Sequence, residues 1–161
     1  MNVINIGYRL AYNAVHPFVK PVWWLLGKDL IGVYVVVWHD GRVLAIKNSY
    51  KREYCLPGGM VDAGESPTEA GARELREEVG VHVQASDLQH VHDIVQKGGR
   101  SADHAYVVSV DWPGPQPELV IDGREVVWAD FISPQELLAR PLAPGLEAFL
   151  IDAAKARGLP V

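Results

Sequence analysis

The alternation of apolar and polar positions divides the chain into strand-like and helix-like segments. Residues 30–38, LIGVYVVVW, form an apolar run rich in β-branched side chains. The run is too short to cross a bilayer, so it predicts a buried strand. The dipeptide Asp40-Gly41 follows and predicts a hairpin turn into a second strand at residues 42–46. A polar loop, residues 47–53, comes next.

The strongest helix signal begins after Ser66. Ser66 and Glu69 have the spacing of a capping box, and Pro67 stands at the first helical position. Gly80 marks the end, because glycine readily adopts the left-handed conformation that closes helices. The pattern predicts a helix between these two residues.

A helical wheel separates two groups of side chains on this helix. The apolar arc, which we expect to face the core, contains Thr68, Ala72, Leu75 and Val79. Three acidic residues fall on a different arc, because positions i, i+3 and i+4 share a face; they are Glu74, Glu77 and Glu78. Such a group is either an ordinary charged surface, relieved by neighbouring arginines, or a site for a hard cation that prefers oxygen ligands.

The remaining patterns predict further strands and two helices. The strand-like runs lie near residues 80–84, 88–95, 104–112 and 125–131. A second capping box, Ser133 to Glu136, opens a short helix, and residues 144–157 read as a C-terminal helix. The order of strands, helix, strands and helices predicts one mixed α+β domain with helices packed on a sheet.

Composition narrows the function classes. A chain of 161 residues suits a single domain, and its 48% hydrophobic and 22% charged residues are ordinary for a globular protein. The net charge of −5 and the lack of a basic block give no reason to expect a nucleic-acid polymer as partner. The single cysteine, Cys55, excludes an intrachain disulfide and suits a reducing cytoplasm. Its apolar neighbours favour a packing role over a nucleophilic one.

The N-terminal segment, residues 1–28, differs from the domain at residues 29–161. Its apolar and aromatic stretch is interrupted by His16, Pro17, Lys20 and Pro21, so it is a poor signal peptide and too broken for a transmembrane span. We expect it to pack on the domain or across a homodimer. An interfacial membrane segment led by Trp23 and Trp24 is the less favoured interpretation.

Residues 59–81, GMVDAGESPTEAGARELREEVGV, resemble the Nudix box. That box is a glycine, five residues, a glutamate, seven residues, and then Arg-Glu-aliphatic-any-Glu-Glu-any-Gly-aliphatic. Every specified position matches: Gly59, Glu65, Arg73, Glu74, Leu75, Glu77, Glu78, Gly80 and Val81. The resemblance implies the Nudix α/β/α sandwich with a mixed sheet.

The resemblance also implies a reaction, the Mg²⁺-dependent (or Mn²⁺-dependent) hydrolysis of a diphosphate linkage. The substrate would be a nucleoside diphosphate linked to another moiety, or a nucleoside triphosphate. The metal ligands would be the Gly59 carbonyl, Glu74, Glu77 and Glu78, with Glu74 also able to orient water and Arg73 holding the carboxylates. Glu65 would contact the metal through water or stabilise the loop. The alternative is a non-catalytic Nudix-like domain that senses a ligand or binds a partner.

Several residues outside the box are further candidates. Nudix enzymes often recruit another acid from a later loop; here Glu125 is our choice, and Asp103, Asp111, Glu118 and Asp122 are also possible. Residues that could contact substrate are Lys47, Arg52, Tyr54 and Glu118, while Tyr54 and Trp128 could equally pack in the core. Alternation places His90 and His92 on one strand face, where solvent exposure is a more common outcome than metal binding.

Overall fold

The computed structural model describes residues 30–98, 101–121 and 123–161. The N-terminal segment and Asp122 lie outside the described residues, so their predicted roles stay predictions. In the described part, no helix is long and apolar enough to cross a membrane.

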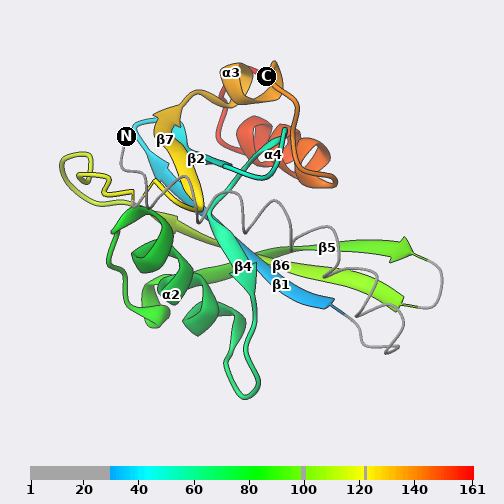
Figure 1. The fold of residues 1–161 in the computed structure, drawn as a ribbon. Coiled ribbons are helices and arrows are strands. Elements are labelled where there is room, and N and C mark those ends of the chain that lie inside the picture. The colour runs from blue at the N-terminus through cyan, green and yellow to red at the C-terminus, as the bar shows by residue number, and fades with distance from the viewer. Residues whose placement is uncertain (1–29, 99–100, 122) are drawn as a thin grey trace.

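One mixed sheet forms the centre of the domain (Figure 1). Its strands are β1 (Leu30–His39), β2 (Arg42–Asn48), β3 (Tyr54–Cys55), β4 (Gly58–Met60), β5 (Gln89–Gly98), β6 (Ser101–Asp111) and β7 (Val126–Ile132). The order is β3-β2-β1-β6-β5, with β4 paired to β1 and β7 paired to β2. β1 and β6 run parallel, whereas the other pairs are antiparallel. The predicted hairpin turn is present, with positive φ at both Asp40 (47°) and Gly41 (73°).

Helices cover both sides of the sheet (Figure 1). α2 (Pro67–Val79) lies on one side, and α3 (Pro134–Leu138) and α4 (Leu146–Ala156) lie on the other. Both predicted capping boxes are formed, at Ser66 and at Ser133. The predicted α/β/α sandwich in one domain is therefore confirmed.

Close packing fixes α2 against the sheet. Leu75 and Val79 are fully buried, and so is Gly71, where a methyl group would lie 2.9 Å from Val108 Cγ2 and 3.1 Å from Val35 Cγ2. These branched side chains come from β6 and β1, so there is no room for a side chain at residue 71. The small residue lets the helix backbone approach the sheet closely, and the carboxylates one turn later are held at a fixed position.

The strand predicted near residues 80–84 is wrong. Gly80 takes the left-handed conformation at φ 71°, and the N–H groups of Gly80 and Val81 donate to Arg76 and Leu75 at the helix end. The chain then continues irregularly into a short 3₁₀ helix, η1 (Ala85–Asp87). The apolar residues that imitated a strand, Val81 and Val83, instead pack beside the helix end.

The prediction that His90 and His92 share a strand face is also wrong. The register shifts between them, so His90 pairs with Val108 and His92 with Val107, which point to opposite sides of β6. The His90 ring contacts Tyr106, while the His92 ring contacts Phe149 of α4 at 5.4 Å. One extra residue in the strand thus separates the two histidines.

Candidate functional site

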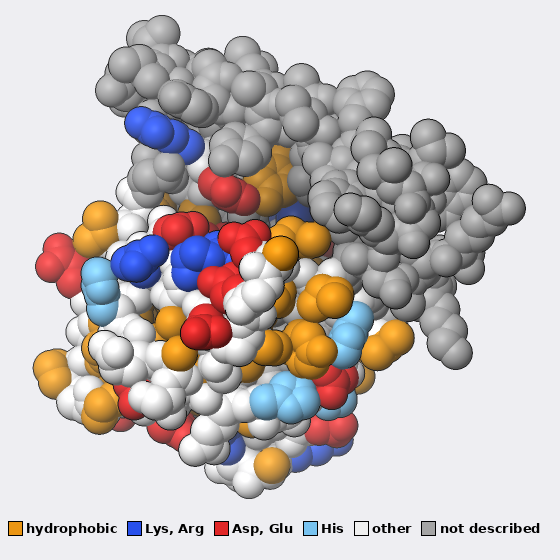
Figure 2. All heavy atoms as spheres, turned by 90° about the horizontal axis from the view of Figure 1, so that it is seen from below, with side chains coloured by type: hydrophobic (Ala, Val, Ile, Leu, Met, Phe, Trp, Pro, Cys, Tyr) orange, Lys and Arg blue, Asp and Glu red, His pale blue; other side chains and the backbone are white. Residues whose placement is uncertain are grey.

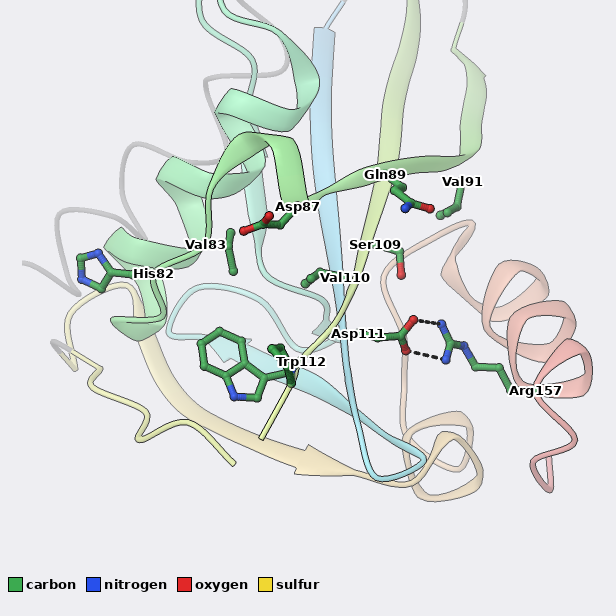
Figure 3. A pocket seen from close by; sticks show the side chains of 11 residues that line it. His82, Val83, Asp87, Gln89, Val91, Ser109, Val110, Asp111, Trp112 and Arg157 are labelled. Atoms are coloured by element: carbon green, nitrogen blue, oxygen red, sulfur yellow. Dashed lines mark hydrogen bonds and ion pairs between the residues drawn. The ribbon is translucent and has the colours of Figure 1, made fainter. Parts of the chain in front are cut away.

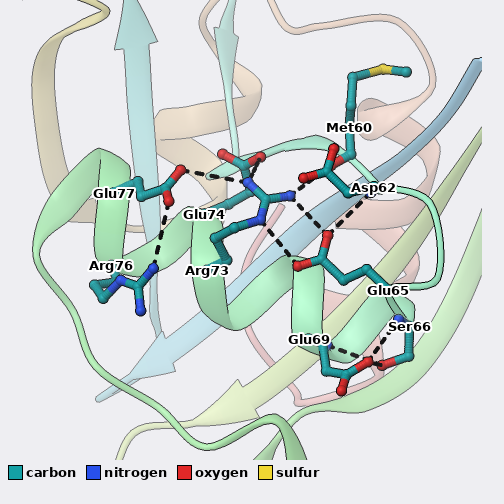
Figure 4. A network of polar contacts seen from close by, with 9 residues as sticks. All are labelled: Met60, Asp62, Glu65, Ser66, Glu69, Arg73, Glu74, Arg76 and Glu77. Carbon is teal, nitrogen blue, oxygen red and sulfur yellow. Dashed lines mark hydrogen bonds and ion pairs between the residues drawn. The ribbon is translucent and has the colours of Figure 1, made fainter.

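Arg73 organises the polar face of α2 (Figure 4). Its Nε and Nη2 atoms donate to the two Glu65 oxygens at 3.0 Å each, so the pair is bidentate. Nη1 donates to Glu74 Oε1 at 2.7 Å and Nη2 to the Met60 carbonyl at 2.8 Å. A longer contact of 3.5 Å reaches Glu77. One guanidinium therefore joins the β4 loop, the entry to the helix and two of the carboxylates.

Glu65 stabilises the loop that precedes the helix. Besides its two bonds from Arg73, it accepts the backbone N–H of Asp62 at 3.1 Å. The Arg73 hydrogen bond holds the pKa of Glu65 below its ordinary value. Of the two roles left open for Glu65, the contacts favour the loop role. Seen from the side of α2, acidic and basic side chains lie together in one patch (Figure 2).

Two glycines bring the backbone of β4 up to the acidic side chains. A Cβ at Gly59 would lie 2.3 Å from Glu74 Oε1, and a Cβ at Gly58 would lie 2.0 Å from the Val33 carbonyl oxygen. Gly58 also has φ 154°, which side chains rarely adopt, and its N–H donates to Glu78 Oε2 at 2.8 Å. Any larger residue at either position would displace a carboxylate or the strand pairing.

The wheel placed Glu78 off the core-facing arc of α2, and that placement is wrong. The Glu78 side chain is buried, at 8% exposure, next to Leu75 and Val79 on the inner side of α2. Burial is the main cause that raises the pKa of Glu78 to about 8. The charges of Glu74 and Glu125 act in the same direction, while the Gly58 N–H and the charge of Lys51 act to lower this pKa. Burial likewise raises the pKa of Glu74. The two wheel residues Thr68 and Ala72, expected in the core, are only partly buried.

Glu125 is the candidate loop acid whose charge acts on the acidic cluster, which comprises Glu74, Glu77 and Glu78. It directly precedes β7, and its charge raises the pKa of both Glu74 and Glu78. The Tyr50 hydroxyl donates to Glu125 Oε1 at 2.6 Å. Sequence reasoning missed Tyr50; the available signal was an aromatic residue in an otherwise polar loop.

The other candidate loop acids lie elsewhere. Asp111 forms a bidentate pair with Arg157 at 2.6 and 3.1 Å, and Glu118 is exposed on the proline-rich loop. The strand that carries Asp103 is described, but its side chain is not. The structure thus brings Glu125, among the candidates whose side chains are described, to the acidic cluster.

The candidate substrate residues Lys47 and Tyr54 share one face of the sheet with Trp128. Lys47 pairs with Tyr54 on one side and Trp128 on the other, and the two rings meet edge to face at 5.4 Å. Lys47 Nζ lies 4.6 Å and Arg140 Cζ 4.7 Å from the Tyr54 ring centroid. All four side chains are partly buried. Tyr54 and Trp128 therefore pack against the core and also leave part of each ring accessible to a ligand. Arg52 is exposed, and only its carbonyl joins this group, through Lys47.

Cys55 has the environment of a packing residue. It is buried, its thiol donates to Asn48 Oδ1 at 3.2 Å, and burial raises its pKa to about 12. A thiol in that state is a poor nucleophile.

The acidic cluster suits a hard divalent cation. Its donors are all oxygens, and a cation would offset the mutual repulsion that raises the pKa of Glu78. Across the described residues, no three His, Cys, Asp or Glu side chains are grouped closely enough to hold an ion as they stand. Magnesium does not require such a cage, because it commonly uses one or two carboxylates together with water and substrate phosphates.

A cleft of about 580 Å³ lies away from these carboxylates (Figure 3). Its wall includes His82, Asp87, Trp112, Asp111 and Arg157, and none of the box residues. The only guanidinium in the wall is engaged by Asp111, as the dashed lines show. The cleft therefore lacks both the metal ligands and the available positive charge that a diphosphate needs.

The chain matches the family model described as NUDIX domain over residues 28–153. It belongs to the Nudix family. A MutT-like protein of Streptomyces ambofaciens is 39% identical over 64 residues, which is 40% of this chain and 42% of that protein. The chain thus spans less than half the length of this relative. The CTP pyrophosphohydrolase of Escherichia coli K12 is 30% identical over 129 residues, covering 73% of this chain and 89% of that enzyme.

A solved structure supports the same assignment. The E. coli ORF135 protein superimposes with a TM-score of 0.65 and 25% sequence identity, over 81% of this chain and 91% of that one. The Nudix fold predicted from the box is therefore confirmed beyond the box itself.

Proposed function

We propose that this Nudix protein is a Mg²⁺-dependent pyrophosphohydrolase that cleaves a diphosphate linkage in a small nucleotide. The substrate is a nucleoside diphosphate linked to another moiety, or a nucleoside triphosphate. The observation that carries the proposal is the approach of two carboxylates to the β4 backbone, where Glu78 accepts the Gly58 N–H and Glu74 lies against Gly59. The charge of Glu125 acts on both carboxylates. The relative named CTP pyrophosphohydrolase supports the proposal.

In this proposal, Glu77, Glu78, Glu74 and the Gly59 carbonyl hold the metal ion. Bound Mg²⁺ supplies positive charge that offsets the diphosphate and lowers the pKa of a nearby water. Glu77 is half-exposed, at 52%, and can turn toward an incoming ion. Glu78 is held by the Gly58 N–H, so its carboxylate would offer the ion a ligand in a set position. Arg73 keeps Glu74 in place and remains charged.

Glu125 orients the attacking water and accepts its proton. Glu74 is less suited to this step, because Arg73 Nη1 already occupies its Oε1 at 2.7 Å. Among the described side chains, the Glu125 carboxylate accepts a hydrogen bond from the neutral Tyr50 hydroxyl, which leaves its second oxygen for the water. The water oxygen forms a bond to phosphorus while the bridging P–O bond breaks and its electron pair leaves on the second phosphate.

We place the nucleoside end of the substrate near the row of Tyr54, Lys47 and Trp128. Aromatic rings can stack on a base, and Lys47 and Arg140 add positive charge that no carboxylate neutralises by a salt bridge within the described residues. Arg52 and Glu118 are candidates from the sequence alone. Both side chains are exposed, and none of their described contacts supports a substrate role.

A hydrolysis screen tests the proposal. Purified protein is incubated with nucleoside triphosphates including CTP, nucleotide sugars, dinucleotides and ADP-ribose, with Mg²⁺ or with chelator, and products are followed by ³¹P NMR. Reaction in ¹⁸O-labelled water identifies the phosphorus that is attacked. We expect Mg²⁺-dependent release of a phosphomonoester with one labelled oxygen. If these nucleotides bind but none is hydrolysed, the ligand-sensing alternative replaces the enzyme assignment.

A further inference from the structure

The loop between β2 and β3 holds Glu125 by two separate contacts. The backbone N–H of Ser49 donates to the Glu125 carbonyl at 2.7 Å, and the Tyr50 hydroxyl donates to its carboxylate at 2.6 Å. The carboxylate contact joins residues 75 positions apart in the sequence. A short bond from a neutral donor to a carboxylate is among the stronger hydrogen bonds in proteins.

The strand that follows Glu125 is irregular at the same place. The pairing of β2 with β7 shifts between Lys47 and Asn48, which face Trp128 and Val126 and leave Val127 as an extra residue. Bulges change the direction of nearby side chains and are common next to active sites. Glu125 lies just beyond this bulge, and its charge acts on Glu74 and Glu78.

We infer that Tyr50 is a positioning residue, whose hydroxyl aims the Glu125 carboxylate at the water that attacks the diphosphate. The inference rests on the proposed function, in which Glu125 accepts the proton of that water. With Oε1 fixed by Tyr50, rotation of the carboxylate is restricted. The Tyr50 hydroxyl restrains Glu125 by a hydrogen bond alone and adds no positive charge beside it.

The protonation state of Tyr50 agrees with this role. Burial, followed by the hydrogen bond to Glu125, raises the pKa of Tyr50 well above its ordinary value. The hydroxyl therefore keeps its proton at any pH at which the enzyme would work, and Tyr50 is always the donor. Lys51 lies with its Nζ 5.5 Å from the Tyr50 ring centroid, which also restrains the ring.

A double-mutant cycle tests the inference. The variants are Tyr50→Phe, Glu125→Gln and the combination, each assayed with Mg²⁺ on the nucleotide that the wild type hydrolyses fastest in the screen. We expect Tyr50→Phe to lower kcat by roughly tenfold, the scale of one lost hydrogen bond to a charged group, with KM within about twofold. In the Glu125→Gln background the same change should cause no further loss of kcat, because Tyr50 acts through Glu125.

Tyr106→Phe is the matched control. Tyr106 is partly buried on β6, and its ring contacts His90 and His104. Neither histidine belongs to the box, so kcat of Tyr106→Phe should equal that of wild type. Melting temperatures confirm that each variant is folded. An unchanged kcat in Tyr50→Phe overturns the inference while wild-type turnover upholds the proposed function. Equal losses in both backgrounds also overturn it, because Tyr50 would then act independently of Glu125. A wild type that hydrolyses no nucleotide refutes the proposed function itself.

Discussion

Arg73 meets its partners in a geometry that lysine cannot reproduce. The guanidinium binds Glu65 with two parallel bonds while also contacting Glu74 and the Met60 carbonyl. We predict that Arg73→Lys lowers kcat/KM by at least about tenfold, because Glu74 and the β4 loop lose their common support. Steady-state kinetics at saturating Mg²⁺ measures the effect.

Arg76→Lys provides the control for that change. Arg76 is half-exposed on the same helix and touches Glu77 at 3.5 Å, a contact of little energetic consequence in solvent. Its activity should stay close to wild type. Equal activities of the two lysine variants would show that the bidentate network around Arg73 is unnecessary.

Glu78→Gln is predicted to stabilise the metal-free protein at alkaline pH. The folded pKa of Glu78, about 8, lies above its unfolded value of 4.5, so the folded state binds the extra proton between these values. Stability from this group is therefore present at low pH and is lost as the pH rises through the folded pKa. Glutamine carries no charge and can still accept the Gly58 N–H. In chelator, the melting temperature of the variant should exceed that of the wild type by more at pH 8.5 than at pH 5.5.

The same substitution should nearly abolish catalysis. Loss of a metal ligand usually lowers turnover by on the order of a hundredfold or more. An exposed acid on α4, Glu147, gives the comparison: Glu147→Gln should change neither turnover nor the pH dependence of melting. Wild-type turnover in Glu78→Gln would remove Glu78 from the proposed metal site.

The identity of the acidic residues was accessible from the sequence, but their burial was not. The spacing of the box is enough to select Glu74, Glu77 and Glu78. The wheel grouped Glu78 with the other acids away from the core-facing arc, whereas its carboxylate is buried and accepts the Gly58 N–H. Tyr50 and Glu125 are far apart in sequence, so their hydrogen bond depends on how β2 and β7 pair.

The helices were predictable because their ends are fixed by hydrogen bonds between residues that are close in the sequence. Ser66, Pro67 and Gly80 define α2 through contacts within a few residues, and the same holds for Ser133 at α3. β4 was not predicted, because Gly58-Gly59-Met60 has no strand propensity and pairs with β1 through backbone bonds alone. The false strand at residues 80–84 has the opposite cause, because its apolar residues suggest a strand but do not pair with the sheet. Val81 is buried in the core and Val83 packs partly buried against it.

Leu75 connects α2 to the core, and its truncation should damage stability more than chemistry. The side chain is completely buried, on the side of α2 that faces the sheet. We predict that Leu75→Ala lowers the free energy of unfolding by roughly 2–5 kcal/mol, while kcat per folded molecule stays within a few-fold of wild type. Denaturant unfolding and kinetics at low temperature separate the two effects. Val95→Ala is the control, because Val95 is 55% exposed and its loss should cost less than about 0.5 kcal/mol.

The fold as a whole brings carboxylates from α2 and from just before β7 close enough for their charges to act on one another. α2 is held against one side of the sheet by its contact at Gly71, and β7 delivers Glu125 from another part of the sheet. The packing free energy of the core therefore holds together carboxylates that repel one another. A protein with a net charge of −5 gains little from its surface in attracting an anionic nucleotide, so in the proposed function a bound cation would supply positive charge.

Folding and metal binding should consequently be linked. An ion that binds only the folded state at about ten times its Kd stabilises by about 1.4 kcal/mol, which raises the Tm of a domain of this size by roughly 3–5 °C. We predict such a rise for the wild type in Mg²⁺ or Mn²⁺ relative to chelator, and none for the combined Glu77→Gln and Glu78→Gln variant. That variant should itself melt no lower than wild type in chelator, since it has lost repulsion and no core contact. Calorimetric titration with Mg²⁺ and a non-hydrolysable nucleotide gives the matching measurement of uptake. If the double variant binds and is stabilised as strongly as wild type, the cation is held elsewhere and the acidic face of α2 is only a charged surface.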